Sequence, residues 1–153
     1  MPSLELKIPP PIVVVITGLL MWLTPAFMAD VLVGYTGCID LGAMLMLLGI
    51  FTDAYAAIMF VTAKTTISPI APQKSSTLIV NGPFKLTRNP MYLGMAALLL
   101  GWALVLENPL ALLGPILFVM YITRFQIIPE ERILTEKWGE LYTAYLIKTK
   151  RWL

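Results

Sequence analysis

Long apolar runs dominate the chain, and four of them predict membrane-spanning helices over about residues 12–33, 38–63, 91–106 and 110–128. A run of about 20 apolar residues can cross a hydrocarbon core of about 30 Å. Gly34–Gly37 and Glu107–Pro109 read as tight turns, so successive helices should be antiparallel. No small-residue cleavage site clearly follows the first run, so we expect a membrane helix there and not a signal peptide. The pattern predicts one all-α, polytopic membrane domain over residues 1–153.

The last part of the chain has an amphipathic pattern, which predicts a helix over about residues 129–147 lying at the membrane surface. Its apolar face, at about 100° per residue, comprises Ile127, Leu134, Trp138, Leu141, Tyr142 and Tyr145. Arg132, Glu136 and Glu140 lie on the opposite face. Glu130 and Glu131 flank the apolar stripe. The residues alone favour two carboxylates that complement the helix dipole, and the alternative is carboxylates turned inward to cap, pair or bind.

The longest polar segment is the loop over residues 64–90, which is rich in Ser, Thr and Pro and has no acidic residue. It leads into the stretch Gly82–Gly94, which reads G-P-F-K-L-T-R-N-P-M-Y-L-G. Pro83 and Pro90 fix their own φ and keep the preceding residues out of the helical region. The helix N-terminus after Pro90 offers unpaired N–H groups that suit an acceptor-rich ligand. Two interpretations stay open: the floor of a ligand site, or a membrane-surface loop with lipid-anchoring cations.

The cations of the chain all fall on one side of the predicted bundle. Lys7 precedes the first helix, the loop carries Lys64, Lys74, Lys85 and Arg88, and the others lie at or after Arg124. Loops rich in Lys and Arg stay in the cytoplasm, so we expect a multi-pass protein with both termini and the loop over 64–90 on that side. Asp30 and Glu107 mark the opposite face.

The composition supports a membrane protein, because 58% of the 153 residues are hydrophobic and only 13% are charged. The chain has no histidine and a single cysteine, Cys38, so we expect no metal site and no histidine-dependent triad. A net charge of +2 gives no indication of nucleic-acid binding. Asp53 lies deep in the second run and must be paired, protonated or facing a polar cavity. We interpret it as the structural partner of a tyrosine or arginine on another helix.

Three separated blocks carry a resemblance to a known family. They are G-P-F-x-x-x-R-N-P-M-Y-L-G, then Pro129-Glu130-Glu131, and then W-G-x-x-Y-x-x-Y with a closing R-W. In this order they resemble the isoprenylcysteine carboxyl methyltransferase and phospholipid methyltransferase superfamily, whose members are integral-membrane enzymes that use S-adenosylmethionine. The resemblance covers roughly Thr65 to Trp152, and the first half of the chain matches only as hydrophobic helices.

By this resemblance, the donor would be bound by Ser76, Thr77, Leu78, Ile79, Phe84, Asn89, Pro90, Met91, Tyr92 and Glu130, of which Glu130 would hold the donor's ammonium group. Arg88 belongs to the motif and would orient the acceptor or brace Glu131, and these two residues are our candidate catalytic pair. Many family members have histidine in place of Ser76 and tyrosine in place of Phe84. Each difference removes a hydrogen bond near the donor, which affects the geometry of the site but not the fold.

The resemblance implies methyl transfer from S-adenosylmethionine at the cytosolic membrane face, a displacement for which a histidine-free site is no obstacle. The apolar helices leave little soluble surface, so we expect membrane lipids as partners and a lipid or lipid-attached acceptor. A prenylcysteine-type carboxylate is already a nucleophile and would need a cation such as Arg88 or Arg124. A phosphatidylethanolamine-type amine would need a base such as Glu131, Asp53 or a tyrosine. The cation-rich segment favours an oxygen or thiol acceptor.

A non-catalytic interaction subunit with four membrane helices is the rival class. It explains the apolar runs equally well, but not an inward-facing Glu130 together with R-N-P-M-Y. Such a subunit needs no ligand, so donor binding would distinguish the two classes. A transporter is disfavoured, because neither an inverted repeat nor a pair of broken helices is visible.

Overall fold

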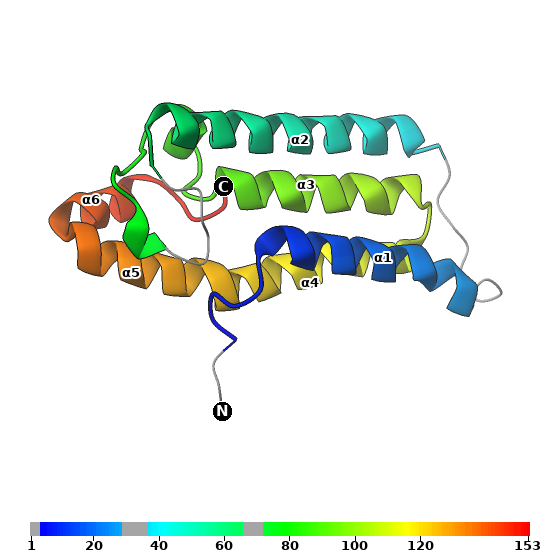
Figure 1. Ribbon diagram of the computed structural model, residues 1–153. Coiled ribbons are helices and arrows are strands. Elements are labelled where there is room, and N and C mark those ends of the chain that lie inside the picture. The colour runs from blue at the N-terminus through cyan, green and yellow to red at the C-terminus, as the bar shows by residue number, and fades with distance from the viewer. Residues whose placement is uncertain (1–3, 29–36, 66–71) are drawn as a thin grey trace.

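The architecture is a bundle of antiparallel helices with a smaller helical cap at one end (Figure 1). The computed structural model describes residues 4–28, 37–65 and 72–153. The helices are α1 (Pro10–Met28), α2 (Ile39–Thr62), α3 (Pro90–Val105), α4 (Leu113–Ile122), α5 (Ile128–Trp138) and α6 (Glu140–Lys148). Three short 3-10 turns, η1 (Pro72–Lys74), η2 (Gly82–Lys85) and η3 (Pro109–Leu112), and a π-helical turn, Thr123–Ile127, complete the set of described elements. Helices α1 to α4 alternate in direction along the bundle.

The tightest helix pair is α2 against α3, and glycines allow its close approach. Gly49 faces Gly94, and Gly42 faces Gly101, two turns away. A methyl group added at Gly49 would lie 2.5 Å from the carbonyl oxygen of Gly94, and one at Gly101 would lie 2.5 Å from that of Gly42. Contacts this short leave no room for any side chain. The two backbones therefore pack directly on each other, as small residues allow in membrane helix pairs.

Helix α1 packs on α3 and α4 around a buried apolar core that includes Leu99, Phe118 and Ile122. Two polar contacts fix its position along the bundle. The indole N–H of Trp102 donates to the Gly18 carbonyl oxygen at 3.2 Å, and the Asn108 amide donates to Thr24 Oγ1 at 2.8 Å. Each contact satisfies a polar group inside an otherwise apolar interface.

Two of the described helices are long and apolar enough to cross a membrane. They are α2, with 24 residues and a mean hydropathy of 2.0, and the continuous helix Pro109–Trp138, with 30 residues and a mean hydropathy of 1.7. Shorter apolar helices cover Pro10–Thr24 and Pro90–Val105. The protein buries only 11% of the most apolar window of α2, so side chains such as Phe51 point outward, which suits a lipid environment. The all-α prediction is confirmed, and the four-span arrangement stays a prediction.

The fourth helix does not end at residue 128, as the sequence predicted, but continues through the π-turn into α5. Pro129 has no N–H to offer the carbonyl oxygen of Phe125, four residues earlier. The backbone N–H of Leu6, from the N-terminal segment, donates to that oxygen at 3.0 Å instead. The N–H of Ile128 bonds to Thr123 five residues back, which is the π-helical pattern. Because another segment supplies the missing donor, Pro129 widens the helix without ending it.

The predicted surface helix over 129–147 is also corrected, because α5 and α6 are separate helices divided at Gly139. This glycine has φ 53° and ψ −125°, a conformation that side chains disfavour, and the chain changes direction there. Tyr142 and Tyr145 remain buried as the apolar face predicted, but Leu141 is 70% exposed. A single helical wheel could not place Leu141 correctly once the helix axis had changed.

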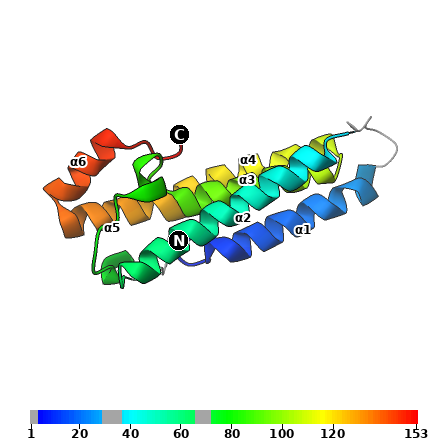
Figure 2. The ribbon, with the colours of Figure 1, turned by 90° about the horizontal axis from the view of Figure 1, so that it is seen from above.

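The cap consists of η1, η2, α5, α6 and the C-terminal segment, all at the end of the bundle where α2 finishes and α3 begins. Figure 2 shows α6 diverging from the bundle axis. The C-terminal segment returns to the start of α3, where Thr87 and Lys150 form an isolated parallel bridge and the Arg88 N–H donates to the Lys150 carbonyl oxygen at 2.9 Å. The C-terminal segment therefore brings the closing R-W motif next to the Gly82–Gly94 stretch.

Candidate functional site

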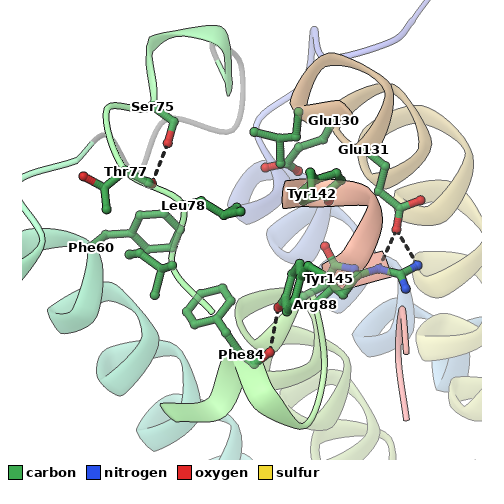
Figure 3. Close-up of a pocket in the computed structure, with 13 residues that line it drawn as sticks. Phe60, Ser75, Thr77, Leu78, Phe84, Arg88, Glu130, Glu131, Tyr142 and Tyr145 are labelled. Atoms are coloured by element: carbon green, nitrogen blue, oxygen red, sulfur yellow. Dashed lines mark hydrogen bonds and ion pairs between the residues drawn. The ribbon is translucent and has the colours of Figure 1, made fainter. Parts of the chain in front are cut away.

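Two adjoining cavities lie in the cap, and they share one wall. The first, of about 90 Å³, is lined by residues of η2, α5, α6 and the segment over 75–79 (Figure 3). The second, of about 220 Å³, is more apolar and opens beside the first residues of α1 and α3. The residues common to both are Phe60, Phe84, Arg88, Asn89 and Glu130. The arrangement suits two ligands that meet at this shared wall.

The segment over 75–79, which forms one wall of the first cavity, is fixed by polar contacts. Ser75 Oγ donates to the Thr77 carbonyl oxygen at 3.0 Å. From the opposite side, Lys137 Nζ on α5 donates to the carbonyl oxygens of Gln73 and Ser75 at 2.6 and 2.5 Å. Since a loop without regular structure must satisfy its backbone groups in this way, these contacts determine where Leu78 and Ile79 face the cavity.

Glu130 lies at the centre of the shared wall. The Tyr92 hydroxyl, on the first turn of α3, donates to Glu130 Oε2 at 2.9 Å. This carboxylate forms no salt bridge with a described cation, whereas its neighbour Glu131 forms two. Burial raises the pKa of Glu130 to about 7, and a positively charged ligand group beside it would stabilise the ionised carboxylate.

Glu131 turns the other way, into an ion-pair network with two arginines. Arg88 contacts Glu131 Oε1 through Nε at 3.1 Å and NH2 at 2.8 Å. Arg151 contacts it through Nε at 3.2 Å and, at Oε2, through NH2 at 2.6 Å. The Arg88 and Glu131 side chains are 11% and 13% exposed, so this pair is shielded from water. Removing one partner from such a buried network leaves an uncompensated charge and is strongly destabilising.

The remaining donors of Arg88 hold the end of α6. Its NH1 group donates to the carbonyl oxygens of Leu146, at 3.0 Å, and Thr149. The Tyr145 hydroxyl donates to the Phe84 carbonyl oxygen at 2.6 Å and so connects α6 to η2. Burial raises the pKa of the Tyr145 phenol, which keeps this hydroxyl protonated and able to donate. Arg88 is thus a bracing residue whose donors are already engaged.

Most of the predicted site residues line the two cavities. They are Thr77, Leu78, Ile79, Phe84, Arg88, Asn89, Pro90, Met91, Tyr92, Glu130 and Glu131. Ser76 is a correction, because it faces away: its Oγ donates to the Lys64 carbonyl oxygen at 3.2 Å, and its neighbour Ser75 lines the cavity instead.

Asp53 does not line either cavity. It lies between α2 and α3 against Gly94, and its Oδ1 atom is buried with no hydrogen-bond partner among the described residues. The predicted tyrosine or arginine partner is therefore not found in the described part of the chain. Because Asp53 lines neither cavity, it is also a poor candidate for the base that an amine acceptor would need.

Several lining residues were missed in the sequence, namely Phe60, Leu134, Tyr142 and Tyr145. Signals for three of them were present, because Leu134, Tyr142 and Tyr145 lie on the predicted apolar face of the last segment. Phe60 gave no signal, since it lies in a uniformly apolar run. It reaches the site because the end of α2 extends to the cap, where its ring packs edge-on against Phe84 at a centroid distance of 5.5 Å.

The apolar helices indicate a membrane-associated helical protein with two adjoining cavities at one end of its bundle. This chain belongs to the phospholipid methyltransferase family, whose sequence model matches residues 38–141. The chain is also similar, with 48% identity over 63 residues, to an uncharacterized protein of Haemophilus influenzae; the match covers 41% of this chain and all of that protein. No solved structure matches. The predicted superfamily is confirmed, and membership indicates a membrane methyltransferase with lipid substrates, of a class that generally uses S-adenosylmethionine.

Proposed function

We propose that this protein transfers a methyl group from S-adenosylmethionine to a lipid or lipid-attached acceptor at the membrane. The observation that carries the proposal is the shared wall at Glu130, where a polar cavity and an apolar cavity meet. Methyl transfer between two substrates requires both to lie in line at a single point from which water is excluded. Two adjoining cavities of unlike polarity meet that requirement.

The first cavity suits the donor because its lining matches the chemical groups of S-adenosylmethionine. Glu130 offers a buried carboxylate for the ammonium group. Phe60, Phe84 and Leu134 offer apolar surface for the adenine, and Thr77 and Asn89 offer polar atoms for the ribose and carboxylate. The donor supplies a methyl group already activated on a sulfonium, so the protein contributes mainly position and shielding.

The second cavity suits a hydrophobic acceptor. Its walls include Pro9, Pro10, Met91 and Met95, and it adjoins Glu130 at one end. A prenylcysteine-type carboxylate is the acceptor that the sequence favoured, but the two cations expected to attract it are engaged elsewhere. Arg88 braces Glu131, and Arg124 pairs with Glu5 at 3.1 Å on an exposed surface.

Because both arginines are engaged elsewhere, we keep an amine acceptor of the phosphatidylethanolamine type as the second candidate. An amine must lose a proton before it attacks. Glu131 is held by two guanidinium groups and is therefore a weak base, and Glu130 is assigned to the donor's ammonium group, so an amine acceptor would have to enter the site already neutral. We retain both acceptor classes, since they differ in a product that is simple to measure.

We further propose that α1, α2, α3 and the helix over 109–128 all span the bilayer, with the cap in the cytoplasm. Helix α3 has 16 residues, a length of about 24 Å, and α1 has 19 residues, about 28 Å. Both lengths approach a hydrocarbon core of about 30 Å, and local thinning of the bilayer can accommodate the difference. The cationic residues Lys64, Lys85 and Arg88 lie on the cap side, as cytoplasmic residues would.

Radiolabelled donor tests the proposal and separates the acceptors. Membranes containing the protein are incubated with S-adenosylmethionine labelled in the methyl group, and extracted lipids are treated with mild base. Volatile methanol identifies a methyl ester, and base-stable label in the phospholipid headgroup fraction identifies N-methylation. The variant that tests the site is Glu130→Gln, which keeps the shape of the side chain and removes the charge.

Equal labelling by the parent protein and by membranes that lack it would contradict the proposal. In that case, the absence of donor binding by purified protein would favour the interaction-subunit class. Labelling that persists unchanged in Glu130→Gln would retain methyl transfer but remove Glu130 from the site.

A further inference from the structure

Gln126 is a buried polar residue that the functional proposal has not used. It is 2% exposed and lies in the π-turn, on the same continuous helix as Glu130. Its side chain lies within hydrogen-bonding reach of both the Glu130 carboxylate and the Tyr92 hydroxyl. An amide buried this completely in an apolar helix is costly unless its hydrogen bonds are satisfied, so its placement beside the shared wall requires an explanation.

The chemistry of the three groups fixes the direction of each hydrogen bond. A carboxylate only accepts, so the Gln126 amide must donate to Glu130. The Tyr92 hydroxyl donates its one hydrogen to Glu130 Oε2, so its oxygen is left to accept from Gln126. The amide nitrogen of glutamine has two hydrogens, which is the number that this closed ring of contacts needs.

The π-turn fixes Gln126 within this ring. Pro129 removes the helical donor for Phe125, and Leu6 replaces it, as described above. The start of the turn is held separately, because Thr123 Oγ1 donates to Val119 at 2.6 Å and accepts from the Trp152 indole at 3.2 Å. One-turn π segments inside helices often mark functional positions, since the extra residue alters which side chains face inward.

We propose that Gln126 is a positioning residue that holds the Glu130 carboxylate toward the donor's ammonium group, an inference that rests on the proposed function. Gln126 and Tyr92 are neutral donors, so they orient Glu130 without cancelling its charge. An arginine in the same place would satisfy the carboxylate and compete with the ligand, which is what Arg88 and Arg151 do at Glu131. The two adjacent glutamates thus receive different partners, and Glu130 forms no salt bridge with a described cation.

A double-mutant cycle on the full-length protein tests this role. Gln126→Met keeps an unbranched side chain of similar length and removes both N–H donors. Binding of S-adenosylmethionine to purified protein should weaken about five- to tenfold, which is the cost of one ordinary side-chain hydrogen bond. In the Glu130→Gln background, the same substitution should cost less than about twofold, because the charge that it orients is already absent. The KM for the donor should rise while kcat changes little.

Two further variants make the outcome decisive. Thr123→Val loosens the π-turn that holds Gln126, so it should lower thermal stability and weaken donor binding in the parent but not in the Glu130→Gln background. Gln126→Glu keeps the size but replaces donors with acceptors, so it should weaken donor binding at least as much as Gln126→Met. If Gln126→Met fails to fold, the cycle is run with Gln126→Glu.

Each result has one meaning. Equal losses from Gln126→Met in the parent and in Glu130→Gln would overturn the positioning role and leave donor binding by the parent protein intact. A parent protein that does not bind S-adenosylmethionine would overturn the proposed function, and this inference with it. A loss of donor affinity from Gln126→Met that occurs only in the parent, where Glu130 is intact, supports both the proposed function and this inference.

Discussion

Glu130 and Glu131 are neighbours in the chain but lie in opposite electrostatic environments. Two guanidinium groups hold Glu131, and the neutral Tyr92 hydroxyl contacts Glu130. Successive residues on a helix point about 100° apart, so an adjacent pair can face two different compartments. The motif therefore combines a structural carboxylate and a ligand-facing carboxylate in two consecutive positions.

Replacing Glu130 with glutamine should weaken donor binding at the residue scale. The substitution removes one charge-assisted contact to an ammonium group, at a cost of about 1.5–3 kcal/mol, or about 10- to 100-fold in Kd. Calorimetry or equilibrium dialysis on purified protein measures the change. The thermal stability of the variant should not fall, since the parent pays to bury a charge that glutamine lacks.

The matched control for this prediction is Glu136→Gln. Glu136 lies on the same helix, is exposed and faces away from both cavities, so its loss should leave donor affinity within error of the parent. Donor binding by Glu130→Gln that equals that of Glu136→Gln would show that Glu130 does not contact the ammonium group.

At the scale of elements, the contact between α2 and α3 depends on glycines that admit no side chain. Gly49→Ala should destabilise the protein by about 1–3 kcal/mol, because its methyl group would meet the Gly94 carbonyl oxygen at 2.5 Å and the rigid backbone cannot move aside. For a chain of this length, that corresponds to a fall in Tm of about 2–12 °C. Thermal unfolding of detergent-purified protein measures it.

Gly18→Ala provides the comparison for this substitution. Its added methyl group would meet Leu99 at 3.9 Å, which is an ordinary van der Waals contact, and alanine favours the helical conformation more than glycine does. We expect an unchanged or slightly higher Tm. A similar fall in Tm for both variants would mean that helix packing, and not the particular glycine contact, determines stability.

The sequence predicted the helical elements well where local signals decide their ends. Helix α2 was expected over 38–63 and runs over Ile39–Thr62, and α3 was expected from residue 91 and begins at Pro90. The sequence predicted the end of the fourth helix wrongly, because Pro129 ends a helix only if no other N–H group bonds to the Phe125 carbonyl oxygen. The group that does so, the Leu6 N–H, lies far away in the sequence and gives no local signal.

At the scale of the whole molecule, the candidate site combines segments from four parts of the chain. Motif spacing predicted that the Gly82–Gly94 stretch and the glutamates lie together, and eleven of the twelve predicted residues line the cavities. Motif spacing could not predict the ion pair between Arg151 and Glu131, since that pair depends on the path of the C-terminal segment in the folded protein. Phe60 was missed for the same reason.

The topology of the whole chain provides a further prediction. In a background with Cys38→Ser, the variants Lys74→Cys and Lys150→Cys should react with a membrane-impermeant maleimide only from the cytoplasmic side. Glu107→Cys should react only from the opposite side, because Glu107 lies where the Gly37 N–H meets the end of α3, at the far end of the bundle. Labelling of Lys74→Cys and Lys150→Cys from different sides would rule out the four-span arrangement.

The contacts that build the cap join segments that lie far apart in the chain. Thr87 bonds to Arg151 across 64 positions, and Arg88 bonds to Glu131 across 43. Helix pairs joined by short connections form early in folding, whereas contacts between distant segments form only after their longer loops have closed. Neighbouring helices with a short connection, such as α3 and α4, can therefore pair while the cap is still open. Local unfolding of the cap would expose the cavities to both ligands without dissolving the bundle, so access and stability are governed by different parts of the same chain.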